Sequence, residues 1–280
     1  MSKKGIILTA MLVLGGLVML LALAIPAKAI TFGEPDLDNT YQNVGAIVVD
    51  LTDRDPLEFC SGTLIAPTVF LTAGHCTDYL VNVLIAGERL TLETTKVSFD
   101  HLDIMNIDSW ISVEQIITHP LYNQMAKNRD FHDVGLLILA EPVTDLPLAN
   151  LPPEGFLDQL YDDALLFDGV NRAMFIVAGY GTAVSWPPPE TVDNGYGRWF
   201  AYSEYQQLMH TWLFMSQNHT QDLGGTCYGD SGGPAFYEDE YGKLWLVGIT
   251  SWGDSLCVAT GFDYRVDTAA TLDFIADNLP

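Results

Sequence analysis

The sequence has few basic residues. Lysine and arginine together number 12, against 36 aspartate and glutamate residues, so the formal net charge at pH 7 is −24. A surface of this charge repels the phosphates of nucleic acids and of anionic lipids, and the composition therefore argues against both as partners. Solubility alone explains such a charge, and we infer no partner from it.

Cysteine is also scarce, and the sequence lacks the Cys-x-x-Cys and closely spaced histidine patterns of structural zinc sites. We therefore predict no metal site and no cofactor. The four cysteines are Cys60, Cys76, Cys227 and Cys257. They allow three pairings, of which the near-neighbour pairing, Cys60 with Cys76 and Cys227 with Cys257, closes a modest loop in each half of the chain.

Long hydrophobic runs are absent except for one uncharged stretch from Gly5 to Ile25, which follows two lysines and precedes the small-residue sequence Ala-Lys-Ala. This order is typical of a signal peptide, here residues 1–29, with cleavage after Ala29. Cleavage predicts a secreted protein, extracellular or periplasmic, in which the cysteines form disulfides. The stretch is also long enough to span a bilayer, so an uncleaved membrane anchor is the alternative.

From residue 30 onward the sequence consists of short apolar runs rich in Val, Ile, Thr and aromatic residues, such as VGAIVVDL, VGLLILA and KLWLVGITSW. Gly, Pro, Asn and Asp interrupt them, a pattern that favours an all-β sandwich or barrel over a βαβ protein. Residues 140–160 carry four prolines and no clear alternation, which predicts a linker between two halves.

Two later regions differ from this pattern. Asp267 is predicted to cap a C-terminal helix through Leu279, with Leu272, Ile275 and Leu279 on its apolar face. Residues 184–224 are harder to interpret, and the segment YSEYQQLMHTWLFMSQ within them fits either a helix or strands.

The stretch GTCYGDSGGPAF, residues 225–236, places Ser231 between Asp230 and two glycines. This serine lies either in an ordinary Gly-Pro turn or in a shaped loop as a nucleophile. A serine nucleophile requires a histidine base and a group that orients the base. His75, in LTAGHC, and Asp133, in HDVGLLILA, are the candidates, because each lies directly at the end of an apolar run.

Four segments together, CSGTLIAPTVFLTAGHC, DVGLLIL, GTCYGDSGGP and ITSWG, resemble the chymotrypsin-like (trypsin-fold) serine peptidases, in their secreted bacterial-type form. The likeness runs from Ile30 to the C-terminal helix and is weakest over residues 184–224. It implies an all-β fold of two six-stranded antiparallel β-barrels with the active site in the cleft between them. Residues 30–140 would form the first barrel, 141–160 the linker, 161–266 the second barrel and 267–280 the helix.

The resemblance also implies roles for individual residues. His75 would be the general base and then acid, Asp133 its orienting carboxylate and Ser231 the nucleophile that forms an acyl-enzyme. The backbone N–H groups of Gly229 and Ser231 would form the oxyanion hole. The resemblance implies the same disulfide pairing as above.

A further implied feature is an ion pair between Asp230 and the free amine of Ile30. Cleavage after Ala29 would expose this amine directly, with no separate propeptide.

The substrate pocket follows from the same resemblance. The position at its base, six residues before Ser231, is Gly225, which favours an uncharged apolar or aromatic side chain before the scissile bond (P1). Asp263, near the pocket floor, favours basic residues instead, and this is our second-ranked expectation. The other expected substrate-binding residues are Thr226, Ser251, Trp252, Gly253 and Gly261, and residues 251–253 would hold the substrate backbone as an added strand.

The sequence thus predicts a secreted serine endopeptidase with polypeptide substrates and with protein inhibitors as further partners. One alternative is a catalytically weak or inactive peptidase-like binding protein, although such proteins usually lose a triad member. Another is an esterase that uses the same triad. The string GDSGG also fits the Gly-x-Ser-x-Gly elbow of α/β-hydrolases, but no βαβ setting accompanies it.

Overall fold

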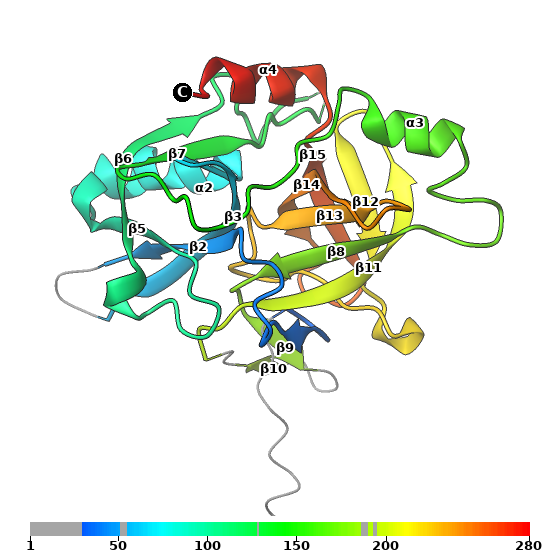
Figure 1. Ribbon diagram of the computed structural model, residues 1–280, viewed down its shortest axis with the longest axis horizontal. Helices are drawn as coiled ribbons and strands as arrows, with labels where there is room; N and C mark the ends of the chain where they lie inside the picture. The colour runs from blue at the N-terminus through cyan, green and yellow to red at the C-terminus, as the bar shows by residue number, and fades with distance from the viewer. Residues whose placement is uncertain (1–29, 51–54, 128, 186–189, 193–194) are drawn as a thin grey trace, which may run out of the picture.

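The architecture was obtained as a computed structural model, which describes residues 30–50, 55–127, 129–185, 190–192 and 195–280. The predicted signal peptide, residues 1–29, lies outside the described residues. Most of the regular secondary structure is β-strand, arranged as two antiparallel barrels that lie side by side (Figure 1). The predicted fold class is therefore confirmed.

The first barrel is closed by six strands in the order β2-β3-β4-β7-β6-β5. All six residues of β2 are buried, as expected for an uninterrupted Val- and Ile-rich run inside a barrel wall that is covered on both sides. The strands are β2 (Val44–Val49), β3 (Leu57–Ala66), β4 (Val69–Thr72), β5 (Thr95–Ser98), β6 (Ile111–Thr118) and β7 (Gly135–Leu139).

The second barrel has the order β8-β11-β12-β15-β14-β13 and is closed because β8 pairs with both β11 and β13. The short strand β1 (Glu34–Pro35) adds to the outer edge of β11. The barrel strands are β8 (Met174–Gly179), β11 (Trp199–Leu208), β12 (Trp212–Ser216), β13 (Pro234–Glu238), β14 (Leu244–Gly253) and β15 (Thr260–Arg265). A hairpin of β9 (Ala183–Ser185) and β10 (Glu190–Val192) lies outside it.

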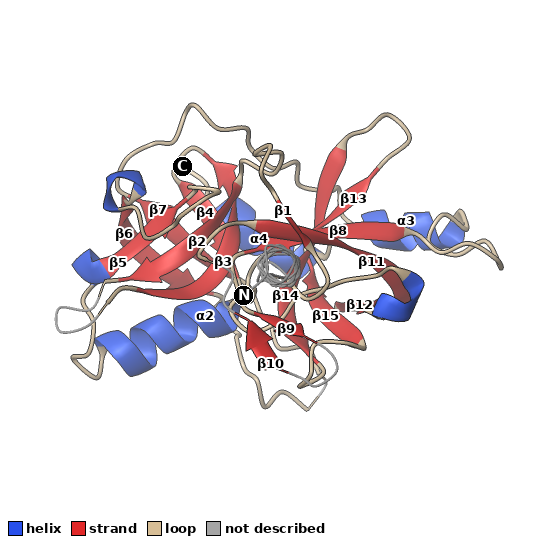
Figure 2. Cartoon of the chain, turned by 90° about the horizontal axis from the view of Figure 1, so that it is seen from below, coloured by secondary structure: helices blue, strands red, loops and turns tan. Residues whose placement is uncertain are grey.

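Short helices connect and flank the barrels (Figure 2). They are α2 (Gly74–Tyr79), the π-helical η1 (Leu80–Ile85), the 3₁₀ turns η2 (Leu92–Thr94), η3 (Ile107–Ser109) and η4 (His219–Gln221), α3 (Phe156–Asp162) and α4 (Ala269–Asp277). Helix α4 follows the second barrel but packs on the first, where the ring of Phe274 lies 4.9 Å from that of His119. Among the described residues, no helix has the length and apolar character needed to cross a membrane.

The structure settles two details of the sequence analysis. The segment with two readings, residues 202–217, forms strands, namely most of β11 and all of β12. The predicted helix cap at Asp267 is wrong, because Thr268 is the N-cap of α4 and accepts the N–H of Thr271. The carboxylate of Asp267 is engaged elsewhere, by the guanidinium of Arg265 and the backbone N–H of Leu157.

Buried polar contacts join the two barrels. Arg198, next to β11, is almost completely buried and donates to Asp36 at 2.8 Å, to the carbonyl of Val44 at 2.9 Å and to the hydroxyl of Tyr180 at 3.1 Å. A buried guanidinium is tolerated only when its donors are satisfied in this way. The contact with Val44, on β2, therefore fixes how the second barrel lies against the first.

Candidate active site

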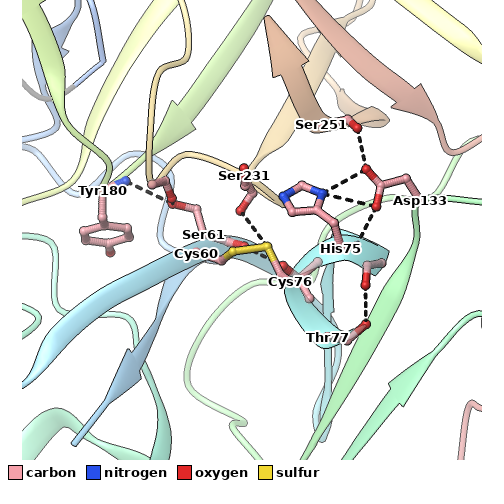
Figure 3. Close-up of a disulfide and its surroundings, with 12 residues drawn as sticks. Cys60, Ser61, His75, Cys76, Thr77, Asp133, Tyr180, Ser231 and Ser251 are labelled. Atoms are coloured by element: carbon pink, nitrogen blue, oxygen red, sulfur yellow. Dashed lines mark hydrogen bonds and ion pairs between the residues drawn. A yellow bond between two sulfur atoms is a disulfide. The ribbon is translucent and has the colours of Figure 1, made fainter. Parts of the chain in front are cut away.

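His75 and Asp133 come together at one end of the first barrel. His75 is the second residue of α2, directly after β4, and Asp133 lies two residues before β7, the neighbour of β4. The His75 ring nitrogen Nδ1 lies 3.0 Å from Asp133 Oδ2 and 3.2 Å from Oδ1 (Figure 3). The backbone N–H of His75 also donates to Oδ1, at 2.7 Å. Asp133 thus orients the ring and satisfies the N-terminus of α2 at once.

Electrostatics strengthen this pair. Burial alone would raise the pKa of Asp133, but the neighbouring His75 and the hydrogen bonds from His75 and from the hydroxyl of Ser251 hold it below its usual value. Burial lowers the pKa of His75, and the carboxylate of Asp133 outweighs burial and raises it. The pair therefore favours a charged carboxylate that stabilises an imidazolium.

Ser231 lies on the other side of the imidazole. Figure 3 shows one ring nitrogen directed at Asp133 and the other facing Ser231. The serine is held by its backbone, because its carbonyl accepts the N–H of Ser61 at 2.8 Å and the next N–H, of Gly232, donates to Thr250 at 2.8 Å. Ser61 lies on β3 of the first barrel, so both barrels position the serine.

The backbone next to Ser231 forms a donor-rich loop. Gly229 has φ +96°, a conformation that disfavours side chains, and a Cβ there would lie 2.5 Å from Glu58 Oε2. Its carbonyl accepts the hydroxyl of Ser61 at 3.3 Å. Among the described residues, no backbone carbonyl accepts the N–H groups of Gly229 and Ser231. These two donors are the ones predicted for the oxyanion hole.

Asp230 and Ile30 are both completely buried. The Asp230 carboxylate accepts the backbone N–H groups of Gly181 at 2.9 Å and Cys227 at 2.8 Å. Burial nevertheless raises the pKa of Asp230 to about 7, and no described cation faces it. Thr31, next to Ile30, bridges Gly225 in the same segment of the chain as Asp230.

Both disulfides have the predicted pairing, Cys60 with Cys76 and Cys227 with Cys257. The first joins β3 to α2 beside His75, and the second joins the segment before Ser231 to the segment after β14. Among the described residues, Cys60, His75 and Cys76 form the one cluster of metal-ligand types. Since its sulfurs are bonded to each other, this cluster offers no thiolate to a metal.

A cavity of about 280 Å³ opens beside Ser231 in the second barrel. Its lining includes Ser231 and the predicted residues Thr226, Ser251, Trp252 and Gly253. Gly225, Gly261 and Asp263 lie outside this lining. The two glycines lie against a residue that the sequence analysis missed, Gln217. A Cβ on Gly225 would lie 2.2 Å from the Gln217 side chain, and one on Gly261 would lie 2.8 Å from its Nε2.

Gln217 therefore occupies the space that these two glycines leave, and it donates to the carbonyl of Thr226 at 3.2 Å. Asp263 is completely buried on β15, directly opposite Thr250. Gln217 lies in residues 184–224, where no motif is found, whereas Thr250, also missed, lies within the segment ITSWG and could have been identified from it.

Comparisons with known proteins agree with this geometry. The family model for trypsin matches residues 37–275. The chain is 27% identical to a trypsin of Saccharopolyspora erythraea over 217 residues, which cover 76% of this chain and 83% of that protein. It is 27% identical to chymotrypsin-C of Rattus norvegicus over 208 residues, 70% and 68% of the two chains. A trypsin-like protease of Streptomyces glaucescens is 26% identical over 212 residues, 72% and 67% of the two chains. The chain belongs to the trypsin family of serine endopeptidases.

Proposed function

We propose that this chain is a catalytically active, secreted serine endopeptidase that uses His75, Asp133 and Ser231. The observation that carries the proposal is the orientation of the His75 ring, which directs one nitrogen at a buried carboxylate and the other at Ser231 (Figure 3). A binding protein has no use for an imidazole that a buried carboxylate holds in this orientation toward a serine. Polypeptides are the proposed substrates and protein inhibitors the proposed further partners.

In this mechanism His75 removes the proton of the Ser231 hydroxyl as the oxygen attacks the scissile carbonyl. The imidazolium that forms is stabilised by Asp133, and it then protonates the leaving amine. The negative charge on the tetrahedral intermediate is accepted by the N–H groups of Gly229 and Ser231, which donate to no backbone carbonyl among the described residues. Water then cleaves the acyl-enzyme with the same groups in the reverse roles.

We further propose that cleavage after Ala29 activates the protein. Ile30 is buried with φ +43°, a backbone conformation that is unfavourable for a β-branched residue within a chain. Removal of the preceding residue abolishes this torsion and its cost. It also creates an ammonium group near the segment that carries Asp230, whose carboxylate faces no described cation.

The P1 preference has two readings. Gly225 and Gly261 favour an uncharged P1 side chain only if the space beside them in the pocket is open. Gln217 occupies this space, which weakens that argument. The buried carboxylate of Asp263 then favours a basic P1 side chain over an uncharged one.

The test of the proposed function is labelling with a fluorophosphonate, which reacts with activated serines. The protein beginning at Ile30 and its Ser231→Ala variant are treated alike, and the modified peptide is located by mass spectrometry. We expect modification of Ser231 that is absent from the variant. A folded protein that begins at Ile30 and is not labelled would instead be a binding relative. Assays on peptides and on small esters then distinguish the two enzyme classes. A peptidase cleaves the peptides, whereas an esterase cleaves only the esters.

A further inference from the structure

A second carboxyl group lies close to Asp230, and the mechanism proposed above does not use it. It belongs to Glu58, the second residue of β3. The residue as a whole is partly exposed, but its Oε1 is buried and has no hydrogen-bond partner among the described residues. An unpaired buried carboxylate oxygen is rare and costly, so this group calls for a physical explanation.

A bulge in β3 directs the Glu58 side chain toward the second barrel. In the pairing with β2, the register shifts between Glu58 and Cys60, so Phe59 is an extra residue on β3. Side chains three residues apart on a regular strand point to opposite faces, and one extra residue between them brings them to the same face. The bulge therefore lets Glu58 and Ser61 reach the same part of the second barrel.

Both side chains contact Gly229, one of the two proposed oxyanion-hole donors. The Ser61 hydroxyl donates to the Gly229 carbonyl at 3.3 Å and accepts the N–H of Tyr180 at 3.1 Å (Figure 3). Glu58 Oε2 occupies the space of the missing side chain, because a Cβ on Gly229 would lie 2.5 Å from this oxygen. The Glu58 carboxyl group thus lies against the backbone whose N–H is proposed to bind the oxyanion.

The carboxyl groups of Glu58 and Asp230 resist being charged together. Burial, and after it the charge of Asp230, raises the pKa of Glu58 well above its usual value. Two carboxyl groups in one buried place keep a proton between them over a wide range of pH. Asp230 accepts two backbone N–H groups, which favour its ionised form, whereas Oε1 of Glu58 accepts none from the described residues. The proton therefore resides on Glu58.

The other groups around Glu58 do not change this assignment. Val48, opposite it on β2, and Gly181, which lies against Gly229, carry no titratable side chain. Among the described residues, Asp230 supplies the charge that acts on Glu58. The proposed cleavage adds one ammonium group, at Ile30. One ammonium neutralises one of the two carboxylates, so Glu58 stays protonated beside an ionised Asp230.

We propose that protonated Glu58 is a positioning residue for the oxyanion hole and that its ionisation at alkaline pH disables the hole. The neutral carboxyl group fills the space beside Gly229. The ionised group repels the carboxylate of Asp230, and as a charged acceptor it draws the Gly229 N–H away from the substrate oxygen. This inference rests on the proposed peptidase function and adds to it a residue and a pH dependence.

The test compares rates of fluorophosphonate labelling at pH 7 and pH 9.5 in the protein that begins at Ile30 and in its Glu58→Gln variant. Glutamine keeps the size of the side chain and does not ionise. Between the two pH values, the wild-type rate should fall about tenfold more than the rate of Glu58→Gln, a part of the roughly 10²- to 10³-fold cost of losing one oxyanion donor. Deprotonation of the Ile30 amine should lower both rates alike. Glu114→Gln, exposed on β6, removes the same charge and should show the wild-type fall.

Infrared spectroscopy provides a readout that needs no catalysis, because a protonated carboxyl group has a C=O stretching band distinct from that of a carboxylate. Between pH 7 and pH 9.5, the wild type should lose one more protonated carboxyl group than Glu58→Gln. Should Glu58→Gln fail to fold, Glu58→Met, with a neutral side chain of similar length, serves instead and should give the same two results.

Two results would overturn the inference. One is a labelling rate that falls equally or more steeply in Glu58→Gln, and a steeper fall would mean that ionised Glu58 pairs with the Ile30 ammonium. The other is an infrared titration in which both proteins lose the same number of protonated carboxyl groups. A labelled protein with either result refutes only the role of Glu58. A protein that is unlabelled at both pH values but shows the additional carboxyl group of Glu58 refutes only the peptidase function.

Discussion

A free amine at Ile30 should stabilise the folded protein at neutral pH. The comparison is between the protein that begins at Ile30 and the same protein with Ala29 retained. Burial raises the pKa of Asp230 from 3.8 to about 7 in a chain whose Ile30 nitrogen is part of a peptide bond. A shift of three pKa units corresponds to about 4 kcal/mol of lost stability at neutral pH, which an ion pair at this site offsets.

The sign of the pH dependence follows from the raised pKa. A carboxyl group that holds its proton more tightly in the folded state makes the protein lose stability as the pH rises from about 4 to about 7. The form with Ala29 suffers this loss in full. In the form that begins at Ile30, the ammonium, charged below a pH of about 8, offsets the loss by pairing with the carboxylate. The stability difference between the two forms should therefore grow by about 4 kcal/mol between pH 4 and pH 7.5, on top of the pH-independent gain from the removed Ile30 torsion.

Guanidinium chloride unfolding, followed by tryptophan fluorescence at several pH values, measures this difference. The matched control is Asp230→Asn in both forms, which should make the stability difference between them independent of pH. Parallel stability curves for the two forms between pH 4 and pH 7.5 would refute the ion pair between Ile30 and Asp230.

Three further changes test other parts of the structure. Asp133→Asn should lower the rate of fluorophosphonate labelling about 10⁴-fold, because an amide N–H that faces the ring leaves the proton on the nitrogen next to Ser231; a loss below tenfold would contradict the assigned role. For an Arg peptide, kcat/KM should rise about tenfold more between pH 7 and pH 9 than for a Leu peptide, because only ionised Asp263, with its pKa of about 8, binds the cation; identical profiles would contradict this. Arg198→Met should destabilise the protein by about 3–5 kcal/mol in urea unfolding, since it leaves the buried charge of Asp36 unpaired; a loss below 1 kcal/mol would show that this ion pair is not needed.

The sequence predicted those features that depend on local patterns. Short β-branched runs between turn residues are sufficient to indicate strands, and the two-barrel class followed from a resemblance carried by motifs around His75, Asp133 and Ser231. The disulfides were predictable because each pair is near in sequence and each half of the chain holds one.

Features that depend on distant contacts were missed or wrong. Asp267 has the residue type and position of a helix cap, but Arg265 and the N–H of Leu157 bind its carboxylate, and 110 residues separate it from Leu157. Gln217 belongs to no motif, and its place becomes visible only once β12 has brought it against Gly225 and Gly261. Among the described residues the carboxylate of Asp263 has no hydrogen-bond partner, which is likewise a property of the packed barrel rather than of the neighbouring sequence.

The hydrogen bonds of Ser61 bear on the order in which the molecule assembles. The proposed base, His75, and its carboxylate belong to the first half of the chain and the proposed nucleophile, Ser231, to the second. Ser61 on β3 donates its N–H to the carbonyl of Ser231, 170 residues later. The N-terminal strand β1 must wait even for β11 before it has a partner. Contacts between such distant segments form late in folding. During synthesis from the N-terminus, the first barrel is therefore complete before the second. The proposed active site forms only when the second barrel packs against the first.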